Sequence, residues 1–168
     1  PLETEIKAEA LKLGFVVCGI ARLTRPDTYD AFQDWIKAGC HAGMAYLAKP
    51  ESLSARADPA SLLPGSRSVI CVGLPYLPPE EPEPAAMTGK GSIAAYAHFP
   101  DYHKVLSAKL KQLGERLPAL AGHAVSFRPC VDSAPILEKD LARQAGLGWV
   151  GRNSLLNAPG FGSYLVLG

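Results

Sequence analysis

The sequence predicts an α+β fold, an α/β sandwich in which a mixed sheet is flanked by helices. Segments with the helical period of apolar residues alternate with short β-branched, apolar runs. Residues 154–168 resemble a hairpin around a Pro-Gly turn, which argues against a purely parallel sheet. A chain of 168 residues, 48% hydrophobic and 20% charged, is long enough for one domain with a sizeable core.

The N-terminal elements follow from periodicity. Residues 2–13 have one apolar face and end at Gly14, which predicts a helix, and residues 15–23 read as a buried strand. Residues 27–39 predict a second helix, again ending on a glycine. Its apolar positions are Tyr29, Phe32, Trp35 and Ile36.

The middle of the chain is less regular. Residues 43–49 predict a short helix, and the proline-containing stretch 49–66 predicts a loop. Residues 66–76 are the clearest strand of the sequence, because they are apolar and rich in β-branched side chains. The Pro- and Glu-rich residues 77–91 lack periodicity and predict a flexible surface excursion.

The C-terminal half returns to alternating elements. After an extended segment and a turn at Pro100, Asp101 is placed to cap a long helix. Residues 123–131 predict a strand, and residues 134–146 predict a further helix. We see no internal repeat.

Bulk properties exclude several classes of protein. The net charge of +1 provides no overall field for binding a polyanion, and no dinucleotide or Walker phosphate-binding motif follows a strand. The four cysteines are irregularly spaced, which favours buried, reduced thiols in a cytoplasmic protein. The longest apolar runs are shorter than the roughly 20 residues that span a bilayer, so we expect no export signal or membrane anchor.

Asp132 is the main candidate for chemistry, and two interpretations of it are open. It precedes a predicted helix whose Pro135 suits a first turn, so Asp132 or Ser133 could simply cap that helix. Alternatively, its carboxyl group donates a proton to a substrate. A helix N-terminus lowers a carboxyl pKa, whereas proton donation needs a raised one, so the second interpretation requires a bulky ligand that excludes water. Glu138 is interpreted as a surface or ion-pairing residue.

The glycine-rich segment 145–154 also has two interpretations. Its backbone could approach a flat ligand, with Trp149 as a stacking face, or it could be a tight helix-to-strand connection around a core tryptophan. His103 lies at a helix start and Arg56 in a predicted loop, where solvent-facing side chains are the usual case. No His or carboxylate pair has metal-ligand spacing.

Several segments together resemble the epoxyqueuosine reductases, in order and spacing. They are "AGCHAGMAYL", "RADPASLLPGSRSVICVGLPY", "YAHFPDYHKVL", "FRPCVDSAPILEKDLARQAGLGWVGRNSLL" and "GSYLVLG". The resemblance implies a nitroreductase-like, cobalamin-binding domain over residues 1–168. In that family it is followed by a module with two 4Fe-4S clusters and by helical repeats. Residues 1–168 contain neither a ligand set for those clusters nor a segment that matches the helical repeats, so we expect a C-terminally truncated fragment.

The resemblance also implies an activity. Such enzymes are cytoplasmic oxidoreductases of queuosine biosynthesis that reduce the epoxide of epoxyqueuosine in a tRNA anticodon loop. Asp132 would be the proton donor. Cobalamin contacts would come from Arg56, Ala95, Tyr96, His103, Asn153 and Leu156, and no residue would bind a metal directly. We expect a monomer and no membrane partner, and the electron donor is not implied.

Two departures and two alternatives accompany the resemblance. Ala95 stands where many relatives have arginine, and residues 98–100 replace a glycine, which predicts an altered pocket rim. A flavin-dependent oxidoreductase of nitroreductase type is the first alternative, since related sandwiches hold flavin. A non-catalytic corrinoid-binding module is the second.

Overall fold

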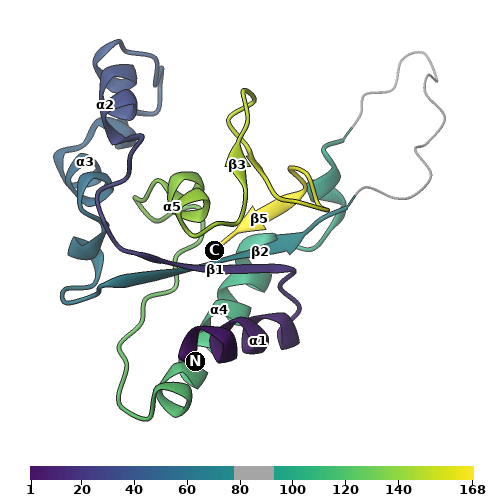
Figure 1. The fold of residues 1–168 in the computed structure, drawn as a ribbon. Helices are drawn as coiled ribbons and strands as arrows, with labels where there is room; N and C mark the ends of the chain where they lie inside the picture. The colour runs from purple at the N-terminus through teal and green to yellow at the C-terminus, as the bar shows by residue number, and fades with distance from the viewer. Residues whose placement is uncertain (78–92) are drawn as a thin grey trace, which may run out of the picture.

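The computed structural model describes residues 1–77 and 93–168, and its centre is a three-stranded antiparallel sheet (Figure 1). The strand order is β1 (Val17–Arg22), β2 (Ser68–Pro75) and β5 (Leu165–Leu167). A second antiparallel pair consists of β3 (Trp149–Val150) and β4 (Leu156–Asn157). The α+β class is therefore confirmed. The expectation of a mixed sheet is wrong for the described residues, because each strand runs opposite to its neighbours.

Helices cover both faces of the central sheet. Helices α1 (Leu2–Lys12) and α4 (Tyr102–Ala121) lie on one face, and α5 (Glu138–Gln144) lies on the other (Figure 1). Strand β2 serves both faces, since successive side chains point in opposite directions. Val72 packs with Leu106 of α4, whereas its neighbour Cys71 packs with Leu141 of α5.

Helices α2 (Tyr29–Lys37) and α3 (Pro50–Ala57) extend from the sheet as an α2–α3 arm, residues 24–66 (Figure 1). The predicted short helix at 43–49 is the 3-10 turn η1 (Ala45–Ala48). The predicted loop at 49–66 is wrong, because α3 and the 3-10 turn η2 (Pro59–Leu62) occupy it. Both start on a proline, whose missing N–H would have no partner at a helix start anyway.

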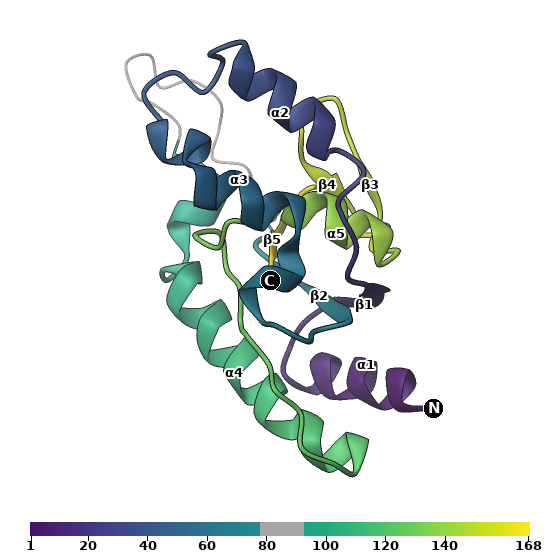
Figure 2. The same ribbon diagram turned by 90° about the vertical axis from the view of Figure 1, so that its left-hand side faces the viewer.

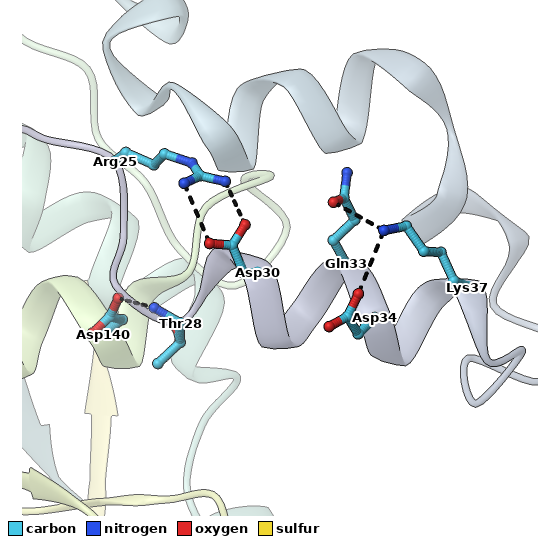
Figure 3. A network of polar contacts seen from close by, with 7 residues as sticks. All are labelled: Arg25, Thr28, Asp30, Gln33, Asp34, Lys37 and Asp140. Atoms are coloured by element: carbon cyan, nitrogen blue, oxygen red, sulfur yellow. Dashed lines mark hydrogen bonds and ion pairs between the residues drawn. The ribbon is translucent and has the colours of Figure 1, made fainter.

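A polar network joins this arm to α5 (Figure 3). The Asp140 side chain is only 2% exposed and accepts hydrogen bonds from the Thr28 backbone N–H at 3.1 Å and from Arg143 Nη2 at 2.7 Å. Arg143 Nη2 also lies 2.5 Å from Asp27 Oδ2. The start of α2 is thereby held against α5.

The predicted strand at 123–131 is wrong. This segment is extended but forms no ladder, and it runs back along α4 (Figure 2). Phe127 packs so closely on Gly114 that a Cβ atom there would lie 2.2 Å from its ring. The place beside β2 is taken by β5 instead, with Leu165 opposite Pro75.

The C-terminal hairpin forms only in part. A single bridge joins Ala158 and Gly162 around the Pro-Gly turn, while β4 pairs with β3 and β5 pairs with β2. Helix α4 is the long helix predicted after Pro100. Asp101 caps it as expected, because its side chain accepts a hydrogen bond from the His103 N–H at 3.0 Å. The 3-10 turn η3 (Ala95–His98) replaces the expected extended segment.

Two further expectations concern the excursion that follows β2 and the absence of a membrane anchor. The predicted flexible excursion lies almost entirely at residues 78–91, outside the described residues. Within the parts of the chain that are described, no helix combines the length and apolar character needed to cross a membrane.

Candidate active site

Asp132 lies in a tight turn between Val131 and helix α5. Its φ of 41° is in the left-handed region, which is uncommon for a residue other than glycine, and the Ser133 N–H donates to the Val131 carbonyl across it. Helix α5 begins only at Glu138, with Leu137 as its N-cap and no side-chain cap. The prediction that Asp132 or Ser133 caps this helix is therefore wrong.

The Asp132 carboxylate contacts the first turn of α4 instead. Tyr102 Oη donates to Asp132 Oδ2 at 3.1 Å, and His103 Nε2 lies 3.1 Å from the same oxygen. His103 Nδ1 lies 3.0 Å from Asp101 Oδ1, so the imidazole bridges two carboxylates. The hydrogen bonds to Asp132 and then to Asp101 raise the pKa of His103 above its ordinary value. Protonated, the ring donates from both nitrogens.

Tyr102 remains a hydrogen-bond donor over the whole physiological range. Burial, and next the negative charge of Asp132, raise the pKa of its phenol to about 12. Its ring stacks on His103 with centroids 4.1 Å apart and meets the edge of Tyr96 at 6.2 Å. Tyr96 in turn packs against Tyr76. An aromatic cluster thus fixes the two groups that hold Asp132.

Asp132 opens into a cavity of about 150 Å³ between α4, α5 and β5. The other lining residues are Tyr102, Glu138, Lys139, Leu155, Leu156, Ser163, Leu165, Val166 and Leu167. A carboxylate, a phenol and a second carboxyl group therefore meet beside apolar side chains. Such a combination of polar groups and an apolar wall is typical of a site that orients and protonates a small group.

Glu138 is the residue that sequence reasoning missed. It is half-buried rather than on the surface, and among the described residues it forms no hydrogen bond or ion pair. Burial, and next the charge of Asp132, raise the pKa of its carboxyl group. The sequence contained a signal for this, since Glu138 precedes the buried Leu141 and Ala142 by three and four residues and so shares their helix face.

A larger cavity of about 570 Å³ is also lined by Glu138. It is bounded mainly by residues 59–67, β2, α4 and residues 123–130, and its lining is mostly apolar. Glu138 and Leu167 line both cavities. We place the chemistry in the smaller cavity, because Asp132 and Tyr102 line only that one.

The structure brings some of the predicted site residues together. Asp132 and Leu156 line the smaller cavity, His103 binds Asp132, and Tyr96 with its neighbour Ala95 adjoins Tyr102.

Arg56 and Asn153 lie outside that cavity. Arg56 is only 8% exposed in α3, donates to the carbonyl and hydroxyl of Ser52, and lies over the Phe32 ring. It has no carboxylate partner among the described residues. Asn153 is exposed, and its Oδ1 accepts the Leu155 N–H at 3.1 Å.

The glycine-rich segment combines features of both interpretations. At Gly148 the connection is tight, because a Cβ atom there would lie 1.9 Å from the carbonyl oxygen of Asn157. Trp149, however, is 58% exposed, so the prediction of a core tryptophan is wrong and its face is open to a flat ligand.

The cysteines form no metal site. All four are unpaired, and within residues 1–77 and 93–168 no three His, Cys, Asp or Glu side chains gather as a potential metal site. Burial raises the pKa of Cys18 to about 11 and that of Cys71 to about 12, as expected for inert thiols. Cys40 is exposed, contrary to expectation.

Comparison with known proteins gives consistent matches. A family model described as "Epoxyqueuosine reductase QueG, DUF1730" matches residues 56–133. Epoxyqueuosine reductases of Vibrio cholerae and Escherichia coli are each 40% identical over 99% of this chain. The chain covers 45% and 44% of these proteins, and so spans less than half the length of the curated relatives it matches.

Solved structures share the fold. The epoxyqueuosine reductase from Streptococcus thermophilus superposes with a TM-score of 0.81 at 24% identity, covering 98% of this chain and 44% of that one. An epoxyqueuosine reductase bound to an epoxyqueuosine-modified tRNA-Tyr stem loop gives 0.77 at 24% identity, covering 99% and 44%. The Bacillus subtilis enzyme, whose catalytic aspartate loop is swung out of the active site, gives 0.73 at 24%, covering 99% and 43%.

Proposed function

The chain belongs to the epoxyqueuosine reductase family, and from this premise we propose that it is the cobalamin-binding, proton-donating domain of such an enzyme. The whole enzyme would reduce the epoxide of epoxyqueuosine in a tRNA anticodon loop to the alkene of queuosine. The observation that carries the proposal is Asp132, held by Tyr102 and His103 at a cavity wall and not used as a helix cap.

The two carboxylate oxygens of Asp132 have different surroundings, and this difference suits the group to proton donation. Oδ2 is held by Tyr102 and His103, while Oδ1 accepts no hydrogen bond from the described residues and is available to a substrate. When His103 is protonated, its Nε2 and the Asp132 carboxylate form an ion pair. A ligand that excludes water favours the neutral pair, in which the proton has moved from His103 to Asp132. The acid is thus formed only when the site is covered.

The residues present fit a bound cobalamin, provided that it lies across the surface. Cobalamin is larger than ligands that fill pockets of roughly 300–1,000 Å³, so the 150 Å³ cavity could receive only the reacting part of the substrate. The open face of Trp149 and the buried guanidinium of Arg56, which has no carboxylate partner among the described residues, suit a broad, flat ligand with polar side groups. Its contacts would be Arg56, Ala95, Tyr96, His103, Asn153 and Leu156.

When bound, cobalamin would supply the electrons that open the C–O bond. The chain's own residues would exclude water, orient the epoxide and protonate its oxygen from Asp132. The side chain of Asp132 is 57% exposed here, so the proposed acid role requires a ligand that covers it and excludes water. In the Bacillus subtilis relative the catalytic aspartate loop is swung out of the active site, and we propose that residues 131–136 of this chain can move in a similar way.

Other parts of the function would come from outside this chain. We propose that residues 1–168 act as a single domain of a monomeric cytoplasmic enzyme, and that two 4Fe-4S clusters elsewhere in the protein pass electrons to it. Transfer RNA would be the substrate.

The test uses the whole enzyme and two matched substitutions. Asp132→Asn should leave the visible spectrum of bound cobalamin unchanged but abolish epoxide reduction. Glu115→Gln is the control, because it removes an exposed carboxylate of α4 that lies outside the cavity and outside the hydrogen bonds around His103, and it should leave epoxide reduction unchanged. Full turnover by Asp132→Asn would refute the acid role. A flavin spectrum without cobalamin uptake would refute the choice of cofactor.

A further inference from the structure

Removing an epoxide oxygen needs more protons than Asp132 holds. Conversion of an epoxide to an alkene consumes two electrons and two protons, because two C–O bonds break and the oxygen leaves as water. One carboxyl group carries one proton at a time. If the proposed function is correct, Asp132 must therefore be re-protonated before the second C–O bond breaks.

We propose that Glu138 supplies this second proton, by re-protonating Asp132 across the cavity that both residues line. Glu138 lies in the first turn of α5, on the face that packs Leu141 and Ala142 into the core. This packing draws its carboxyl group inward. No hydrogen bond or ion pair with a described residue assigns it a structural role.

Glu138 lines both cavities, and titratable groups of three other segments lie near its carboxyl group. Its charge acts on Tyr102 of α4, on Cys71 of β2 and on Cys130 of the segment beside α4. The groups that act on it are Asp132, which raises its pKa, and Lys139, which lowers it less than burial and Asp132 raise it. Glu138 therefore retains its proton at a pH where an exposed glutamate has lost it.

The proposed reaction uses two electrons and two protons. Two electrons come from the reduced cobalamin of the proposed function. Asp132 protonates the epoxide oxygen as the first C–O bond breaks and then takes the proton of Glu138. Asp132 protonates the same oxygen again as the second bond breaks, and alkene and water leave. The Glu138 carboxylate regains a proton from solvent through the larger cavity, which it also lines. Glu138 acts through Asp132 and is a proton-supplying residue, not a catalytic one.

One test needs no cofactor. Carboxyl titration of Glu138, followed by infrared or carbon NMR spectroscopy, should show its pKa above the ordinary glutamate value in the wild-type protein. The pKa should fall in Asp132→Asn, since the neighbouring negative charge is gone. An unchanged Glu138 titration in that variant would overturn the coupling of the two carboxyl groups.

The second test measures single turnover in the whole enzyme loaded with cobalamin. Glu138→Gln should lower the rate by about 10²-fold, the lower end of what a positioned proton carrier contributes. It should also remove the decline in rate that the wild type shows as pH rises through the Glu138 pKa. Glu138→Asp should recover part of the rate, which a merely structural role would not require.

The control is a carboxylate that lies outside both cavities. Glu115→Gln removes an exposed carboxylate of α4 that lines neither cavity, and it should leave rate and pH profile unchanged. Wild-type rate and pH profile in Glu138→Gln, beside an inactive Asp132→Asn, would overturn this inference alone. Activity in Asp132→Asn would instead overturn the proposed function on which it rests.

Discussion

The hydrogen bonds to the Asp140 carboxylate should hold the α2–α3 arm in place, and the substitution Asp140→Ala tests this. The substitution removes acceptors for the Thr28 N–H at 3.1 Å and for Arg143 Nε and Nη2 at 3.1 and 2.7 Å. Hydrogen bonds to charged groups contribute roughly 1.5–3 kcal/mol each. Arg143 is 37% exposed and keeps Asp27, so its two bonds are largely replaced by water.

We therefore expect the free energy of unfolding to fall by about 3 kcal/mol, at the lower end for a broken buried pair. For a chain of this size that corresponds to a decrease in Tm of roughly 6–12 °C. Urea denaturation followed by circular dichroism measures the loss. The matched control is Asp30→Ala, which breaks the exposed pair with Arg25 in the same view (Figure 3) and should cost under about 0.5 kcal/mol.

The arm also carries Arg56, a proposed cobalamin contact, so if that proposal is correct Asp140→Ala should weaken cobalamin binding by the protein that remains folded, without changing any group beside Asp132. Equal stability of Asp140→Ala and Asp30→Ala would refute the reasoning, because it would mean that the buried carboxylate contributes no more than a surface one.

Three further predictions concern packing and pH. Gly19→Ala should destabilise the protein by about 2 kcal/mol in urea denaturation, since its Cβ would lie 2.1 Å from the carbonyl oxygen of Ala145; an unchanged midpoint would contradict this. NMR titration should place the pKa of His103 above the ordinary value and lower it in Asp132→Asn. The stability from this pair should be complete below the ordinary histidine pKa and lost as pH rises through the raised one. The raised pKa of Glu138 means that the folded state binds more protons, so wild-type stability should fall as pH rises through that range. The Tm difference between Glu138→Gln and wild type should therefore grow with pH, and a difference independent of pH would count against a buried acid.

Elements with strong local signals could be predicted from the sequence. Helices α1, α2 and α4 and strands β1 and β2 follow from periodicity, from Asp101 as a cap and from β-branched runs. Helix α3 was missed, because Pro50 was interpreted as a breaker although it occupies the first helical position. Residues 123–131 have a strand-like sequence but no free partner strand, and pairing is a property of the whole fold.

The candidate site likewise has features that the sequence predicts and features that depend on tertiary contacts. The sequence by itself determined the resemblance to the epoxyqueuosine reductases, the α+β class and the candidacy of Asp132, because these depend on motifs and patterns that are local in the chain. Only the tertiary structure decided which groups surround that carboxylate. Tyr102 and His103 reach it across about thirty residues of chain, and Glu138 lies half-buried near it because α5 packs onto the sheet. Burial and charge proximity set proton affinity, and both arise from contacts between segments that no local pattern records.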